Sequence, residues 1–397
     1  MFDAEDCTAV HWPLVRGMNV SDFDFELPDE LIAQDAAPRG TSRLLVLDRA
    51  TGAVSHASVV DLPSILRAGD LLVVNNTRVF AARLLGHRVP SGGAVECLLL
   101  GPTTAMPLDS DSDPRSRSPD PGTRIPDPEV RRIPDREMRT AEALMHPGQK
   151  LKPGAVVRFE GPAGILAGEV IARRFQGRRT IRLWSESGGD VDTLVDALGH
   201  MPLPPYIKRA DTLADRERYQ TVFARVRGSV AAPTAGLHFT PELLTALERA
   251  GVERAEVTLH VGYGTFKPVR VERVEDHVVD PEHYDIAAET ADAITRARKE
   301  GRRVVAVGTT TTRALEDAAR RGGGRVTAGP GTASIFIYPG HQFQAIDALL
   351  TNFHLPASSL LMLVAAFAGK ERVLAAYREA VEQRYRFYSY GDAMLII

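Results

Sequence analysis

The most informative stretch of the chain is a loop rich in glycine and hydroxyl residues, Gly228-Ser-Val-Ala-Ala-Pro-Thr-Ala-Gly-Leu-His-Phe-Thr240. Its glycines and proline interrupt both helices and strands. The residues that follow, Pro241–Ala250, place leucines at helical spacing, so we predict that Thr240 caps a helix and that Pro241 is its first residue. A loop that opens a helix in this way presents backbone N–H groups to an anion or polar ligand. On this stretch alone, a plain loop before a surface helix is an equally good interpretation.

A second strand–loop–helix junction follows at Val304-Val-Ala-Val-Gly-Thr-Thr-Thr-Thr-Arg313. Such junctions are where open α/β sheets bind ligands. The run lacks the further glycines of a dinucleotide fingerprint and the Gly-Lys-Ser/Thr of a P-loop, which argues against both nucleotide motifs. Arg313, in the first helical turn, is a candidate clamp for a carboxylate or phosphate. A plain helix start is the alternative.

Around these junctions the segments indicate a mixed α/β fold. Strand and helix patterns alternate after Asp190, which predicts a mixed sheet covered by helices. Short apolar segments separated by Gly, Pro and polar turns precede it and favour a small antiparallel β-barrel. We therefore expect a main α+β domain of residues 21–66 and 191–397, with an inserted barrel domain of residues 67–190.

Two segments are expected to lie outside this packed structure. Residues 1–20 look like a loose N-terminal extension. Residues 103–140 are rich in Pro, Asp, Ser and Arg and have few large apolar side chains, so they cannot bury enough surface to offset chain entropy. We predict that they form a disordered insertion in a barrel loop.

Composition narrows the class of protein. The 397 residues are 44% hydrophobic and 25% charged, with a net charge of −3, as in ordinary globular proteins, and this balance does not itself indicate nucleic-acid binding. No apolar run approaches the ~18 residues needed to span a membrane, and the N-terminus does not resemble a signal peptide. Cys7 and Cys97 are too few for a disulfide framework. We expect a cytoplasmic protein.

Histidines are the candidate acid/base groups. His238, His260 and His354 come from separate segments and lack the paired spacing of zinc motifs, so no metal site is predicted. His354 lies in Leu350-Thr-Asn-Phe-His-Leu-Pro-Ala-Ser-Ser359, between an apolar segment and a helix start. It is either a satisfied buried histidine or an acid/base group whose pKa lies near the working pH.

Taken together, several runs resemble one family, the S-adenosylmethionine:tRNA ribosyltransferase-isomerases of queuosine biosynthesis. The resemblance covers about residues 21–101 and 143–397 in order, which chance matches to short motifs would not produce. The matching runs are Phe23–Pro28 with Arg39, Ser42–Asp48, Gly69–Val79, Pro202–Lys208, Tyr219–Val222, Gly228–Thr240, Thr258–Phe266, Val307–Arg313 with Leu315-Glu316, Asp347–Pro356 and Ser389–Met394.

The resemblance implies an unusual use of S-adenosylmethionine as co-substrate, without a metal. Its ribosyl part, not its methyl group, is transferred to 7-aminomethyl-7-deazaguanine at the wobble position of a tRNA anticodon loop and isomerised. The products are epoxyqueuosine-tRNA, adenine and methionine. The family fold is a mixed α/β domain with an inserted β-barrel, and we expect a monomer.

The resemblance also implies roles for individual residues. The sulfonium acidifies the neighbouring ribose carbon, so a base must remove that proton, and adenine needs a donor as it leaves. The candidate residues are, for catalysis, His238, His260 and His354 with the carboxylates Glu282 and Asp347; for S-adenosylmethionine, Gly228, Ser229, Thr234, Gly236, Gly308, Thr309, Thr310 and Arg313; and for RNA, Asn76, Arg78, Lys208, Arg386 and Tyr390.

The sequence departs from the family pattern in two places. The usual H-x-M-H-x-E appears as His277-Val-Val-Asp-Pro-Glu282, so Asp280 replaces the second histidine and proton transfer at that position is in doubt. The insertion at 103–140 is absent from the family core, and we expect it to be dispensable.

Other interpretations of the sequence are a tRNA methyltransferase or transglycosylase and, from a different class, a non-catalytic RNA-binding barrel protein.

Overall fold

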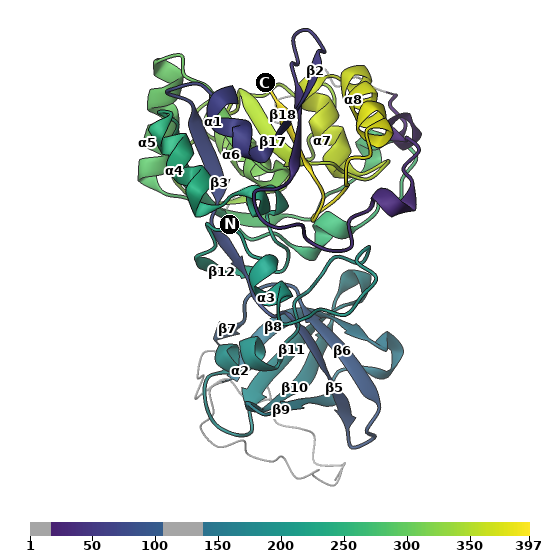
Figure 1. The fold of residues 1–397 in the computed structure, drawn as a ribbon. Helices are drawn as coiled ribbons and strands as arrows, with labels where there is room; N and C mark the ends of the chain where they lie inside the picture. The colour runs from purple at the N-terminus through teal and green to yellow at the C-terminus, as the bar shows by residue number, and fades with distance from the viewer. Residues whose placement is uncertain (1–16, 106–137) are drawn as a thin grey trace, which may run out of the picture. The chain divides into compact units, whose positions relative to one another are not determined.

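The computed structural model describes residues 17–105 and 138–397, and the chain divides into two compact units (Figure 1). One unit contains the chain up to Phe80 together with Leu203–Ile397, and the other is Ala81–Pro202. No helix in the described ranges is long and apolar enough to cross a membrane.

The first unit is built on a nine-stranded mixed sheet. The inner strands β13, β3, β15 and β17 run parallel to one another, and β1 runs parallel to β18, whereas the other neighbours are antiparallel. In spatial order the strands are β16 (Gly329–Ala333), β14 (Glu282–Ile286), β13 (Glu253–Leu259), β3 (Leu71–Asn75), β15 (Val304–Val307), β17 (Ala348–Asn352), β18 (Ala393–Ile396), β1 (Arg43–Leu47) and β2 (Val54–Ser58). A separate parallel pair joins β4 (Thr77–Val79) to β12 (Val226–Ser229).

The central strands are apolar on both faces, as expected for parallel strands covered by helices. Strands β3, β15 and β17 are buried along their whole length. Their register pairs Val305 with both Leu72 and Ala348, so the strands start and end at nearly the same level. The residues that follow their carboxyl ends therefore gather at one edge of the sheet.

Helices cover both faces of this sheet (Figure 1). Val73 and Ala306 face the core shared with α5 (Ala288–Lys299), α6 (Thr309–Arg321), α7 (Ser359–Ala368) and α8 (Lys370–Glu382). Val74 and Val307 face the opposite core, which includes α1 (Leu62–Ile65) and α4 (Pro241–Arg249). The predicted start of α4 is confirmed, because Thr240 Oγ1 accepts a hydrogen bond of 3.1 Å from the Leu243 N–H.

The second unit is a closed antiparallel barrel, which confirms the predicted architecture. Its strands follow the order β11 (Arg178–Ser185), β10 (Gly164–Arg173), β9 (Val156–Gly161), β5 (Arg83–Val89), β6 (Ala94–Leu99) and β8 (Met138–His146), and β8 pairs with β11 to close the ring. The short strand β7 (Thr104–Ala105) adds to β8, and α2 (Val191–Leu198) packs on β9, β10 and β11.

The remaining helical elements are short. Helix α3 spans Asp215–Arg218. Turns of 3-10 helix occupy Val20–Phe23, Asp29–Leu31, Val59–Asp61, Gly148–Lys150, Phe175–Gly177, Thr234–His238, Tyr263–Phe266 and Val274–Asp276.

The boundaries of the compact units differ from those expected for the barrel domain. The expected start at residue 67 placed Leu71–Val74 in the barrel, but this run forms the central strand β3, since its residues are buried on both faces. The expected end at residue 190 excluded α2, whose apolar face packs on barrel strands. Residues 81–202 are therefore the inserted unit.

The two segments expected to be loose lie only partly within the described ranges. Residues 1–16 and 106–137 lie outside them. Residues 17–20 are not loose, because Met18 and Val20 are buried and the Val20 N–H bonds the Glu272 carbonyl at 2.8 Å. Both ends of the expected insertion are ordered in the β7–β8 pair.

Candidate functional site

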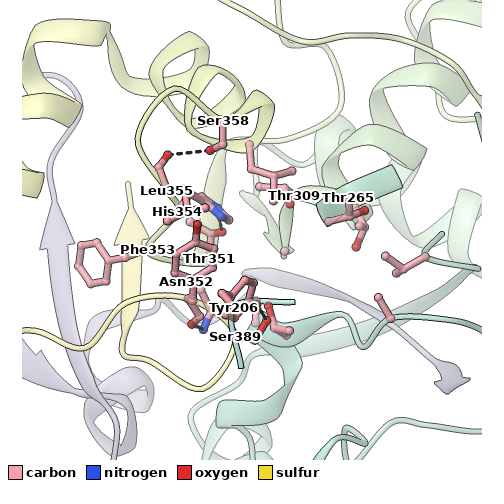
Figure 2. Close-up of a pocket in the computed structure, with 18 of the residues that line it drawn as sticks. Tyr206, Thr265, Thr309, Thr351, Asn352, Phe353, His354, Leu355, Ser358 and Ser389 are labelled. Carbon is pink, nitrogen blue, oxygen red and sulfur yellow. Dashed lines mark hydrogen bonds between the residues drawn. The ribbon is translucent and has the colours of Figure 1, made fainter. Parts of the chain in front are cut away.

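A cavity of about 210 Å³ lies in the first unit, at the carboxyl edge of the parallel strands. It is lined by the segments that follow β12, β13, β15 and β17 and by Tyr206, Tyr388 and Ser389. Figure 2 shows Thr351, Asn352 and His354 grouped on one side, with Tyr206 and Ser389 beside them. This is the position at which open α/β sheets bind their ligands.

One wall of the cavity is the start of α6. Gly308 has φ 93°, a conformation that favours glycine, and it turns the chain from β15 into the helix. The hydroxyls of Thr311 and Thr312 bond back to the Val307 and Gly308 carbonyls, whereas Thr309 and Thr310 line the cavity. The first N–H groups of a helix have no intrahelical acceptor, so this end of α6 favours an anion or a hydroxyl oxygen.

The end of β17 supplies a buried histidine. His354 lines the cavity, and its Nε2 lies 2.9 Å from Thr351 Oγ1. Its backbone N–H donates to the Tyr377 hydroxyl at 3.1 Å, which fixes the turn after the strand. Burial lowers the pKa of His354 to about 3, so the imidazole is neutral at pH 7. Of the two interpretations left open by the sequence, the structure agrees with a hydrogen-bonded buried histidine, which also lines the cavity, and its pKa does not lie near the working pH.

Two tyrosines in ring contact form another wall. The rings of Tyr206 and Tyr388 lie 4.0 Å apart between centroids with their planes tilted by 37°, and the Tyr206 hydroxyl hydrogen-bonds Ser389 Oγ. Tyr388 has φ 75°, a strained backbone conformation of the kind that collects at functional sites. Its hydroxyl is buried and has no hydrogen-bond partner among the described residues. Burial raises the pKa of Tyr388 well above its ordinary value, so the hydroxyl stays protonated.

The sequence did not identify Tyr206, Tyr388 or Asn352 as site residues. In the aromatic run Tyr385–Tyr390, Tyr385, Phe387 and Tyr388 all belong to the core, and of these three only Tyr388 also lines the cavity. No local pattern distinguishes them. The available signals were the prolines before Tyr206, which make that segment rigid, and the resemblance of both segments to the family.

The other two predicted histidines lie outside the main cavity. His238 lines a smaller hollow, and its Nδ1 lies 2.9 Å from Ser42 Oγ. Burial lowers the pKa of His238 to about 4, and its side-chain interaction with Asn352 opposes this shift. His260 is half-buried, with Nδ1 2.8 Å from Thr77 Oγ1, and burial and nearby His283 lower its pKa.

Two of the predicted charged residues pair with each other beside a second cavity of about 50 Å³. Arg313 Nη1 donates to Glu282 Oε2 at 2.5 Å, and the same guanidinium bonds the Ala333 carbonyl at 3.0 Å. Burial raises the pKa of Glu282, and Arg313 opposes this. The guanidinium is therefore held inside the protein and does not line the main cavity.

Asp280, the residue that departs from the family pattern, also has an ionic partner. Its Oδ2 lies 2.7 Å from Lys267 Nζ. Lys267 and Thr265 line both the main and the second cavity, so this pair lies where the two cavities meet. A carboxylate at position 280 thus holds a lysine at the edge of the main cavity.

The remaining predicted carboxylate, Asp347, lies at the other edge of the sheet. It precedes β17, and its Oδ2 accepts the Val304 N–H at 2.9 Å. The five residues of β17 separate it from the cavity edge by about 16 Å. A residue before a parallel strand cannot reach the carboxyl edge, so Asp347 does not join the site.

Among the predicted loop residues for S-adenosylmethionine, Thr234 lines the cavity. Ser229 shapes the loop, because its Oγ accepts the Val261 N–H at 2.8 Å and donates to the Ala231 carbonyl at 2.8 Å. A Cβ on Gly228 would lie 2.6 Å from the His260 ring, and one on Gly236 would lie 2.8 Å from a Thr221 methyl group. These glycines are explained by close packing.

The residues predicted to contact RNA have mixed surroundings. Arg78 and Lys208 are exposed. Asn76 is buried, and its side chain hydrogen-bonds the side chains of Glu256 and Thr258 on β13, so it stabilises the sheet. None of these three lines the main cavity as described.

The other two predicted RNA contacts, Arg386 and Tyr390, both make hydrogen bonds within the protein. Arg386 donates to the carbonyls of Asp35 and Tyr390, at 2.5 and 2.9 Å. The Tyr390 hydroxyl donates to Asp215 at 3.2 Å, and the ring lines the same small hollow as His238.

Fold and cavity together define an α/β enzyme that takes its ligand at the carboxyl ends of parallel strands. The family model described as "Queuosine biosynthesis protein" matches residues 20–396, and the chain belongs to this family. Within the described residues, no group of three His, Cys, Asp or Glu side chains is arranged to hold a metal ion.

Several characterised proteins are similar over their full length. The S-adenosylmethionine:tRNA ribosyltransferase-isomerase of Heliobacterium modesticaldum is 51% identical, covering 96% of this chain and 100% of the relative. That of Desulfitobacterium hafniense is 46% identical over the same shares. The crystal structure of an S-adenosylmethionine tRNA ribosyltransferase from Thermotoga maritima is 35% identical, covers 95% of this chain and 100% of that one, and aligns with a TM-score of 0.49. The resemblance found in the sequence is confirmed: the chain is a transferase of tRNA queuosine modification.

Proposed function

We propose that the main cavity is the reaction site at which the ribosyl part of S-adenosylmethionine is transferred to 7-aminomethyl-7-deazaguanine in tRNA and isomerised. The reaction gives epoxyqueuosine-tRNA and releases adenine and methionine. The observation that supports this assignment best is the combination, in one cavity, of a helix N-terminus, a neutral histidine and two tyrosines in ring contact. Each matches one need of the reaction.

The start of α6 is suited to the polar parts of S-adenosylmethionine. Its unpaired N–H groups and the hydroxyls of Thr309 and Thr310 can hold the methionine carboxylate or the ribose oxygens. Thr234 approaches the cavity from the loop before α4. Arg313 is left out of this assignment, since Glu282 and backbone carbonyls occupy its donors.

The tyrosine pair is suited to a purine-like ring. The ring of Tyr206 is held by its hydrogen bond to Ser389 and by its contact with Tyr388. Aromatic side chains bind bases by stacking, which is worth about 1–3 kcal/mol per base. Either the adenine or the deazaguanine can use this wall, and the Tyr388 hydroxyl remains a donor for a leaving base.

His354 is assigned to proton removal. The sulfonium makes the attached ribose carbon more acidic, so the group that takes its proton must be neutral beforehand. His354 is neutral at pH 7 and lines the cavity, and the contact with Thr351 fixes its ring. Because its pKa in the empty cavity is low, the proposed role requires the bound substrate to raise its basicity. His238 and His260 lie outside the cavity and are assigned supporting roles.

Three further features extend the proposal. The tRNA part recognised is the anticodon loop, the enzyme acts as a monomer, and it works in the cytoplasm. The exposed side chains of Arg78 and Lys208 are candidate contacts for that loop. Size-exclusion chromatography with light scattering tests the monomer, and a minimal anticodon stem-loop tests the recognition element.

The decisive experiment is a liquid-chromatography assay with S-adenosylmethionine and tRNA that carries the aminomethyl-deazaguanine base. Adenine and methionine should appear together, with a matching mass gain on the tRNA. S-adenosylhomocysteine in their place would mean methyl transfer. Tight tRNA binding without turnover would favour a non-catalytic RNA-binding protein.

A further inference from the structure

We propose that a small hollow next to the main cavity is a subsite for a backbone phosphate of the tRNA, adjacent to the modified nucleotide. We call it the arginine hollow; it is lined by Arg39, Ser42, Arg218, His238, Ser389 and Tyr390 with short backbone stretches around them. The inference deepens the proposed function and rests on it.

Two guanidinium groups from separate segments meet in the arginine hollow. Arg39 comes from the loop before β1, and Arg218 ends the short helix α3. Arg39 Nη2 donates to the carbonyls of Glu217 and Gln220, at 3.0 and 2.5 Å, and Arg218 Nη2 donates to the Ala37 carbonyl. These bonds fix the two cations side by side, a costly arrangement that an anion would relieve.

Donors remain available in the arginine hollow. Arg39 Nη1 is buried and has no hydrogen-bond partner in the part of the chain that the structure describes. Burial lowers the pKa of Arg39, and nearby Arg218 lowers it further, as expected for two cations that share a confined space. His238, only 4% exposed, also lines the hollow.

The buried carboxylate on α3 is engaged by another arginine. Asp215 lies on α3 with Arg218, but Arg209 binds both of its oxygens, at 2.7 and 2.9 Å. The Tyr390 hydroxyl adds a further bond to Asp215 at 3.2 Å. Exposed Glu217 and the Tyr390 side chain are the groups that raise the pKa of Arg39, and they only partly offset burial and Arg218.

The position and size of the arginine hollow point to a phosphate. Ser389 lines both it and the main cavity, so a nucleotide whose base enters the main cavity has its sugar–phosphate backbone close by. The hollow has a volume of about 20 Å³ against about 210 Å³ for the main cavity, so it has no room for a second nucleoside and takes at most a small group at its mouth. Paired arginines match the geometry of phosphate oxygens. The methionine carboxylate already has a site at the start of α6, so the tRNA backbone is the source we favour.

The test is tRNA binding by the full-length Arg218→Gln variant, measured by fluorescence anisotropy over a series of salt concentrations. We expect about tenfold weaker binding and a salt slope smaller by about 1, because one phosphate contact is lost. The KM for S-adenosylmethionine should not change. Arg296→Gln is the matched control, since it removes the same charge from an exposed site on α5, near the opposite edge of the sheet.

A second variant guards against a folding defect. Arg39→Lys keeps the charge but loses the paired donors, and we expect it to weaken tRNA binding about as much as Arg218→Gln, with an unchanged thermal transition. Equal tRNA affinity and salt slope for Arg218→Gln and Arg296→Gln would overturn the proposal. A raised KM for S-adenosylmethionine with normal tRNA affinity would overturn it too, and would assign the hollow to the methionine carboxylate.

The outcome is separable from that of the proposed function. Failure of the wild-type protein to release adenine would remove the proposed reaction. The difference in tRNA affinity between Arg218→Gln and Arg296→Gln does not depend on turnover, so it still reports on the phosphate subsite.

Discussion

The two edges of the central sheet treat their buried polar groups in opposite ways. At the amino edge, Asp70 is 2% exposed and receives two bonds from Arg303, at 2.9 and 2.5 Å, and one from the Arg67 N–H. At the carboxyl edge, the buried Tyr388 hydroxyl has no hydrogen-bond partner among the residues described. The carboxylate of Asp70 is satisfied by other groups of the protein, whereas the Tyr388 hydroxyl is left for a ligand in the main cavity.

The difference separates buried polar groups that stabilise the fold from those that lower its free energy of unfolding. An unsatisfied buried polar group costs about 1–3 kcal/mol, so few persist without a reason. The unpaired Tyr388 hydroxyl lies beside the main cavity, where a ligand can bond it. We therefore expect the Asp70 pair at the amino edge to matter for folding and the carboxyl edge to matter for binding and chemistry.

The largest expected effect concerns stability at the amino edge. Asp70→Ala leaves Arg303 without its partner, and we expect the free energy of unfolding to fall by about 3–5 kcal/mol. Activity well below the melting temperature should be retained. Urea denaturation measures the loss, and Glu96→Ala in the partly exposed Arg83–Glu96 pair is the control, with an expected cost below about 1 kcal/mol. Equal losses for the two variants would contradict the contrast between the edges.

The next effect concerns catalysis at the carboxyl edge. His354→Gln should lower kcat by about 100-fold with little change in KM, since it removes the proposed base from the cavity. Steady-state adenine release measures this. His260→Gln and His238→Gln are the comparisons, and both should lose much less. Three near-normal enzymes would remove the histidines from the mechanism.

A third prediction uses pH. The pKa values of His238 and His354, about 4 and about 3, lie below that of an unfolded histidine because of burial. Between about pH 6.5 and pH 4 the unfolded chain therefore binds protons that the folded chain does not. Stability should fall on acidification through this window, by up to ~1.4 kcal/mol per pH unit for each histidine.

Thermal melts from pH 7 to pH 4.5 measure this slope. His238→Asn should reduce the slope of stability against pH by the contribution of this histidine, whereas His146→Asn, at an exposed site, should leave the slope unchanged. A slope that is the same in both variants would show that His238 is not held neutral by the fold.

The smallest expected effect concerns the Tyr388 hydroxyl, whose removal should lower kcat/KM but leave stability nearly unchanged. Tyr388→Phe removes a hydroxyl that is unpaired within the described structure, so stability should change by less than about 0.5 kcal/mol while kcat/KM falls about tenfold. Tyr377→Phe is the matched control, because its hydroxyl accepts the His354 N–H, and its loss should cost about 1 kcal/mol. A stability loss in Tyr388→Phe equal to that of Tyr377→Phe would contradict the assignment.

The parts of the site that the sequence predicted are those set by local structure. Gly308, Thr309 and Thr310 follow an apolar strand and open a helix, so their place at a sheet edge follows from the order of elements alone. His354 follows β17 in the same way. The inserted barrel was likewise visible, because its short strands alternate with turns.

The misplaced residues depend on partners that lie far apart in the sequence. Arg313 was expected to face a ligand, but Glu282, 31 residues away, binds it inside the protein. Asp347 precedes its strand and so lies at the other edge. Tyr388 reaches the cavity through a backbone conformation with positive φ, which residue type does not predict.

The root of the barrel unit has a consequence for how this enzyme can be altered. Arg83 and His200 pair across the base of residues 81–202, each donating its N–H to the other's carbonyl, at 3.3 and 2.8 Å. The chain thus enters and leaves the barrel unit through two residues that lie side by side. A unit whose two ends lie side by side can be replaced by the homologous unit of a relative with only two new junctions in the chain. The backbone of the nine-stranded sheet then need not change.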